Sequence, residues 1–127
     1  MKSLYIKYEI HHAILELRPN SEWHMNGSDY NQLVWHESNT TEKPTLEEIN
    51  AKINELNLAE PMRILREERN RRLEETDWWG LKETDGRMMT QEQKDYRNAL
   101  RDLPSTSTPS LDSYGNLENV TWPVKPE

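Results

Sequence analysis

Three signals for the start of a helix constrain the fold of this chain more than any other feature. They consist of Thr45 with Glu48, Asn57 with Glu60 before Pro61, and Thr90 with Gln93. In such caps a side chain accepts from backbone N–H groups that the first helical turn leaves without partners. The sequence therefore predicts helices over about 45–56, 58–75 and 90–103. We expect a break or sharp kink near Asn57, and Pro104 to stop the last helix.

The last two predicted helices each carry an apolar stripe at helical spacing. The stripes consist of Leu58, Met62, Leu65, Arg69 and Leu73, and of Met89, Gln93, Tyr96, Leu100 and Leu103. Because about 15 residues separate them, we expect an antiparallel helical hairpin. Arg69 is the one charged member, and we expect its aliphatic stem to pack while its guanidinium reaches water, with a buried ion pair as the alternative.

The segment between these helices contains two adjacent tryptophans and a turn signal over 84–86. We expect Trp78 to lie against the helical pair. Asp77 should either cap the next turn or pair with a nearby arginine such as Arg72. In this arrangement Trp78 and Trp79 would cover the closed end of the hairpin.

The first part of the chain mixes helix and strand signals. Residues 4–8 alternate like a short strand, and apolar residues over 10–17 recur at helical spacing up to Arg18, which precedes a proline. Residues 23–25 and 30–35 surround an Asn-Gly turn and predict a β-hairpin, with an irregular loop as the alternative.

The sequence thus predicts an α+β protein with three parts. A small N-terminal helix and β-hairpin region, with the capped helix, occupies residues 1–57. The antiparallel helical hairpin follows over 58–104, and an extended C-terminal segment over 105–127.

Apolar residues are scarce in this chain. Leu, Ile and Val together number 23 of 127 residues, Phe is absent, and the net charge is −7. We expect a modest core that contact with another chain completes, with disorder in isolation as the alternative. Residues 61–103 carry 10 basic and 10 acidic side chains, so the sequence predicts no nucleic-acid binding.

Few residues suit catalysis or ligand binding. The chain has no cysteine and four histidines, of which only His24 and His36 could approach each other, across the predicted hairpin. A metal site needs about four ligands, and no glycine-rich phosphate loop or nucleophile motif occurs. We therefore expect no catalytic, metal-binding or cofactor-binding residues. No apolar run resembles a signal peptide or reaches the roughly 20 residues of a membrane span, so we expect no membrane partner.

Four segments together resemble the bacteriophage tail assembly chaperone family over about residues 58–126. They are the Arg-rich run 65–73, Thr-Asp-Trp over 76–78, Tyr-Arg to Leu-Pro over 96–104, and the closing Asn-Val-Thr-Trp-Pro over 119–123. The loop after Trp79 and the long insert after Pro104 depart from the family pattern.

The resemblance implies a non-enzymatic module that binds a tail, tail-fibre or baseplate protein during assembly in the host cytoplasm. The alternative is a permanent component retained in the virion tail, and self-association stays open. Trp79, Trp122 and Pro123 are the candidate partner contacts, because the helical pair and the hairpin are expected to absorb other tryptophans. Trp122 folding back onto its own helices is the alternative.

Overall fold

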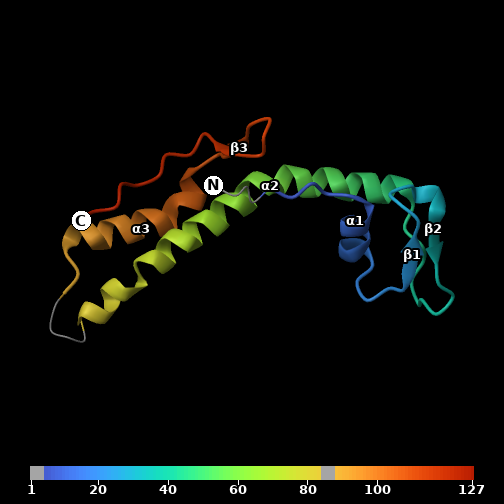
Figure 1. Ribbon diagram of the computed structural model, residues 1–127, viewed down its shortest axis with the longest axis horizontal. Coiled ribbons are helices and arrows are strands. Elements are labelled where there is room, and N and C mark those ends of the chain that lie inside the picture. Colours follow the sequence, from blue (N-terminus) through green and yellow to red (C-terminus); the bar gives the residue numbers. More distant parts are fainter. Residues whose placement is uncertain (1–4, 84–87) are drawn as a thin grey trace. The chain divides into compact units, whose positions relative to one another are not determined.

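The computed structural model describes residues 5–83 and 88–127, so the predicted turn at 84–86 lies outside the described residues. Two compact units emerge: an N-terminal unit, Ile6–Glu60, and a C-terminal unit, Pro61–Glu127, which also includes Tyr5. The elements (Figure 1) are α1 (Ile10–Leu17), β1 (Trp23–Met25), η1 (Tyr30–Gln32), β2 (Leu33–Trp35), α2 (Leu46–Glu75), η2 (Asp77–Glu83), α3 (Gln91–Thr106), β3 (Ser110–Leu111) and β4 (Leu117–Glu118). This is the small α+β fold that the sequence predicts.

The N-terminal unit packs α1 and a β-hairpin against the first part of α2. Strands β1 and β2 are antiparallel, with Trp23 opposite Trp35. Leu33 is buried and its neighbour Val34 exposed, which confirms the predicted hairpin and its inward face. The core of this unit consists of Ala13, Ile14, Leu33 and Ile49.

The predicted strand over residues 4–8 is wrong for the residues described. No neighbouring strand pairs with residues 5–8. Instead, the Ile6 N–H and the Tyr8 hydroxyl donate to the two carboxylate oxygens of Glu60, at 2.7 and 2.9 Å. Glu60 is only 1% exposed, so these bonds satisfy a buried carboxyl group, and the Ile6 N–H is not available to a neighbouring strand.

Helix α2 begins at the predicted capping box. The Glu48 N–H donates to the Thr45 hydroxyl at 3.1 Å, and the Thr45 N–H donates to the Glu48 carboxylate at 3.2 Å. The predicted break near Asn57 is wrong, because α2 runs from Leu46 to Glu75 without interruption and contains Pro61. The alternative, a kink near Asn57, stays a prediction. An interior proline costs about 3 kcal/mol, and the residue before it, Glu60, makes the two buried hydrogen bonds described above.

The C-terminal unit is built on the predicted antiparallel helical hairpin, in which α3 runs back beside the end of α2 (Figure 1). Thr90 and Gln93 form the predicted capping box of α3, with bonds of 3.1 and 3.0 Å. The helix continues through Pro104 to Thr106, so the predicted stop at Pro104 is wrong by two residues. The main cluster of this unit contains Trp79, Tyr96 and Leu100, with Leu73, Met89 and Trp122 packed against it.

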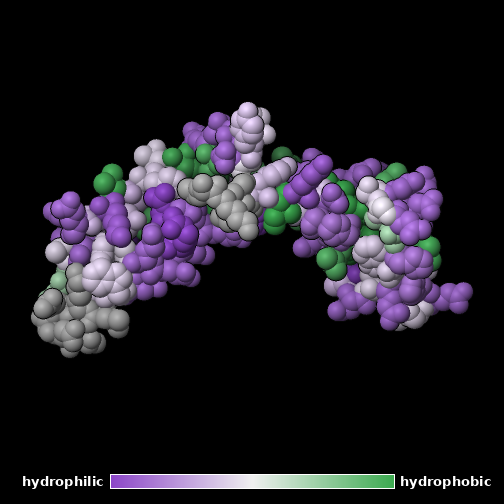
Figure 2. All heavy atoms as spheres, in the orientation of Figure 1, coloured by the Kyte–Doolittle hydropathy of each residue, from purple (hydrophilic) through white to green (hydrophobic). Residues whose placement is uncertain are grey.

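A short hairpin, β3–β4, follows α3 where the sequence predicts only linker and extended chain. The Asp112 carboxylate accepts from the N–H groups of Tyr114 and Asn116, at 2.8 and 2.9 Å. Gly115 has φ +80°, and a Cβ there would lie 2.6 Å from Tyr5. The turn therefore requires glycine. Beyond β4 the chain runs back along α3, and hydrophilic residues cover most of the visible surface of both units (Figures 1 and 2).

Candidate partner-binding face of the C-terminal unit

Arg97 of α3 ties the helical hairpin together at its closed end. Its Nη1 donates to the Leu73 carbonyl at 2.9 Å and to the Thr76 hydroxyl at 2.6 Å. Its Nη2 donates to the Asp77 carboxylate at 2.9 Å. The prediction that Asp77 pairs with an arginine is confirmed, but the partner is Arg97 and not Arg72. One guanidinium thus joins two segments that lie about 20 residues apart in the sequence.

The two adjacent tryptophans have the reverse of their predicted roles. Trp79 is 2% exposed and its ring centroid lies 6.0 Å from that of Tyr96. Trp78 is 52% exposed, so the prediction that it packs against the helical pair is wrong. The prediction that Trp79 contacts a partner is also wrong, because its side chain is buried. The cause is the 3₁₀ geometry of η2, in which residues three apart share a face. Trp79 therefore lies on the same inward face as the buried Thr76, and the backbone N–H of Trp79 donates to the Thr76 carbonyl.

Trp122 is held by a chain of charged contacts on α2. The Glu68 carboxylate, 8% exposed, accepts from Arg71 at 2.6 Å and from Arg72 at 3.0 Å. These bonds lower the pKa of Glu68, and the bond from Arg71 has the largest effect. Burial of the carboxylate acts in the opposite direction. The Arg72 guanidinium lies 4.1 Å from the centroid of the Trp122 ring, a cation–π contact. Trp122 thus folds back onto its own helices, which was the alternative to a free partner contact, and its side chain stays half-buried.

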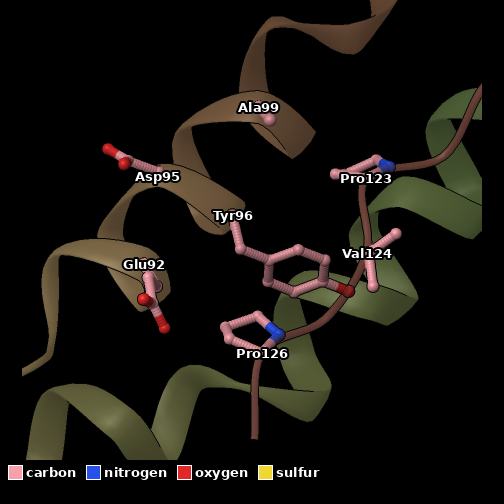
Figure 3. Close-up of a pocket in the computed structure, with 7 residues that line it drawn as sticks. All are labelled: Glu92, Asp95, Tyr96, Ala99, Pro123, Val124 and Pro126. Carbon is pink, nitrogen blue, oxygen red and sulfur yellow. The ribbon is translucent and has the colours of Figure 1, made fainter.

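A groove runs between α3 and the last residues of the chain (Figure 3). Its volume is about 430 Å³, and its lining consists of Glu92, Asp95, Tyr96, Ala99, Pro123, Val124 and Pro126. We call it the α3–C-terminal groove. The Tyr96 ring points from α3 toward the C-terminal residues, and Val124 is 90% exposed. Apolar groups beside two carboxylates suit a partner segment that carries apolar and basic side chains.

Most of the predicted core residues of the hairpin are confirmed. Leu65 and Leu100 are fully buried and Tyr96 is 5% exposed, while Leu73 is half-buried. The guanidinium of Arg69 donates to the Arg101 carbonyl at 3.2 Å and, among the described residues, makes no ion pair. The stripe is wrong at its first position, since Leu58 is 76% exposed.

Several residues of this face were not found from the sequence. One feature of the sequence could have indicated the bridging role of Arg97: the Tyr-Arg and Thr-Asp-Trp segments that it joins belong to the same family pattern. The lining role of Val124 and Pro126 had no signal, since it depends on the path of the C-terminal residues.

The histidines and the helices bear on the predictions about metal ions and membranes. His24 Nδ1 and His36 Nε2 lie 3.1 Å apart, which confirms the predicted approach across the hairpin. Within residues 5–83 and 88–127, however, no group of three or more suitable side chains could hold a metal ion. Nor does any helix among these residues have the length and apolar character to cross a membrane.

Comparison with known proteins gives one match. The family model described as phage tail assembly chaperone protein matches residues 62–127, which is more than half of the chain and nearly the whole C-terminal unit. No curated protein and no solved structure matches. The matched range contains the Arg97 bonds, the Trp122 contact and the α3–C-terminal groove. The chain belongs to the phage tail assembly chaperone family.

Proposed function

We propose that this chain is a non-enzymatic chaperone that binds a tail or tail-fibre subunit in the host cytoplasm during phage assembly. The binding surface is the α3–C-terminal groove with the exposed Val124 at its edge. The observation that carries this proposal is the docking of the C-terminal residues through Trp122, which leaves an apolar groove beside them.

The geometry of the C-terminal residues supports binding at low entropic cost. Trp122 anchors them against Arg72 at 4.1 Å, and Pro123 and Pro126 restrict the backbone on either side of Val124. A surface that is already ordered loses little conformational freedom when a partner docks. Val124, at 90% exposed, is an apolar side chain that gains most from such a contact.

The chain's composition supports the same conclusion. Only 10 hydrophobic side chains are buried among the described residues of the protein. A partner subunit would remove further apolar surface from water, which is the main favourable contribution to association. Trp122 and Pro123 remain partner contacts in this proposal, whereas the buried Trp79 does not.

The experiment compares infected cells with purified particles. Quantitative mass spectrometry measures the copy number of this protein in both, with a structural tail protein as the internal standard. A chaperone is expected to co-purify with a tail or tail-fibre subunit from lysate and to be missing from finished particles. A fixed copy number in the particles would contradict the chaperone role and support a permanent tail component.

A further inference from the structure

The two sides of α3 carry opposite charge. Glu92 and Asp95 lie on the side that faces the α3–C-terminal groove. The other side lines a second groove of about 210 Å³, whose residues are Met89, Lys94, Arg97, Asn98 and Arg101. We call this second groove the basic groove. Its three cations lie at i, i+3 and i+7, so they share one face of the helix.

Most cations in and beside the basic groove make no ion pair. Among the described residues, no carboxylate lies within 4.0 Å of Lys94, Arg101 or the adjacent Arg69. Arg97 alone in the groove pairs with an acid, Asp77. On α2, Arg63, Arg71 and Arg72 each pair with a glutamate at 3.0 Å or less, whereas Arg69 on the same helix lies beside the basic groove without such a pair among the described residues.

Among the described residues, Arg101 in the groove and Arg69 beside it also keep donors without a partner. Arg101 donates from Nη1 to Asn98 at 3.1 Å, and Arg69 donates to Asn70 and to the Arg101 carbonyl. A guanidinium has five N–H donors, so several on each arginine remain for an outside acceptor. Carboxylates match this donor geometry with paired bonds.

We propose that the basic groove binds an acidic segment of a partner protein, with its carboxylates on Lys94 and Arg101. Met89, half-buried at one end of the groove, supplies an adaptable apolar contact, so an acidic segment that also carries apolar side chains fits best. The charge balance of residues 61–103 concealed this surface, because acids and bases separate only when α3 folds.

A long nucleic acid fits the surface less well. The cations number only a few, the net charge of the chain is −7, and the opposite side of α3 is acidic. A polyanion that extended beyond the groove would meet repulsion from these carboxylates. The basic groove and the α3–C-terminal groove lie on different sides of α3, so the two proposals can fail separately.

The test measures binding of a labelled peptide of alternating Glu and Leu to the full-length protein, by fluorescence anisotropy. The matched probe has Gln in place of Glu. Lys94→Glu/Arg101→Glu is expected to weaken binding of the acidic peptide about tenfold at low salt. The control, Lys7→Glu/Lys125→Glu, changes the net charge equally at exposed positions and should leave binding nearly unchanged.

Four results would overturn the proposal. These are no binding of the acidic peptide up to about 1 mM, equal binding of the Gln peptide, equal losses in both double variants, and tighter binding of single-stranded DNA through the same two residues. Circular dichroism confirms that each variant is folded. Val124→Asp separates the two surfaces, because it should leave peptide binding intact even if it abolishes binding of a tail subunit.

Discussion

Removing the Arg97 side chain should destabilise the C-terminal unit substantially. The guanidinium donates to the fully buried Thr76 hydroxyl and to the Leu73 carbonyl, and a hydrogen bond from a charged group contributes about 1.5–3 kcal/mol. Its pair with Asp77 adds at most about 1 kcal/mol, because the Asp77 side chain is 62% exposed. Because both bonds come from the one nitrogen Nη1, their contributions do not add in full, and we expect Arg97→Ala to lower the free energy of unfolding by about 2–4 kcal/mol.

Urea denaturation followed by tryptophan fluorescence measures this change, since the buried Trp79 reports directly on the packing of the hairpin. Arg97→Lys keeps the charge and loses the paired geometry, so it should recover little of the stability. Arg101→Ala is the matched control on the same side of α3, and it should cost less than about 0.5 kcal/mol. In a double-mutant cycle, Arg97 and Asp77 should couple by less than about 1 kcal/mol. A loss of under about 0.5 kcal/mol in Arg97→Ala would refute the bridging role.

Three further predictions concern packing, a turn and pH. Trp79→Ala should cost about 3–5 kcal/mol by thermal unfolding, whereas Trp78→Ala should cost under about 1 kcal/mol; equal losses would contradict their observed burial. Gly115→Ala should lower stability by more than about 1 kcal/mol, because the turn needs positive φ and the added Cβ meets a tyrosine, and an unchanged melting temperature would argue against it. The lowered pKa of Glu68 stabilises the fold above its ordinary value of 4.5 and ceases to do so as the pH falls through the lowered pKa. As the pH falls below about 4.5, Glu68→Gln should therefore lose less stability than the unchanged protein, and an equal loss in both would contradict this.

Local signals in the sequence predicted much of the fold. The capping boxes at Thr45 and Thr90 begin α2 and α3 as expected, because their hydrogen bonds involve only residues three apart. Tyr96 and Leu100 in the apolar stripe of α3 are buried as predicted, because this face of α3 packs along α2. Helical spacing is therefore informative where the whole face meets one partner.

Features that depend on tertiary contacts were not predictable in this way. Helical spacing cannot tell that Leu58 lies outside any core. The continuity of α2 through Pro61 coincides with bonds from Ile6 and Tyr8 to the preceding Glu60, which no local pattern reveals. Helical spacing does not separate the two adjacent tryptophans, and the 3₁₀ geometry of η2 buries Trp79 and leaves Trp78 exposed.

The candidate site was predictable only in part. Trp122 and Pro123 were named as partner contacts from their chemistry. The structure places Trp122 in the cluster around Tyr96 and Pro123 in the lining of the α3–C-terminal groove, and their contact with a partner stays a prediction. The opposite charges on the two sides of α3 were hidden, since the numbers of acids and bases in residues 61–103 are equal.

The affinity of the tail or tail-fibre subunit that co-purifies with this protein tests the account most directly. Val124→Asp places a charge at the edge of the α3–C-terminal groove without disturbing the core, because Val124 is 90% exposed. The matched control, Leu15→Asp, changes an apolar side chain that is 60% exposed on α1. By calorimetry on the purified complex, we predict at least about tenfold weaker binding for Val124→Asp and no change for Leu15→Asp. Unchanged affinity in Val124→Asp, or equal losses in both variants, would contradict the claim that this groove binds the subunit.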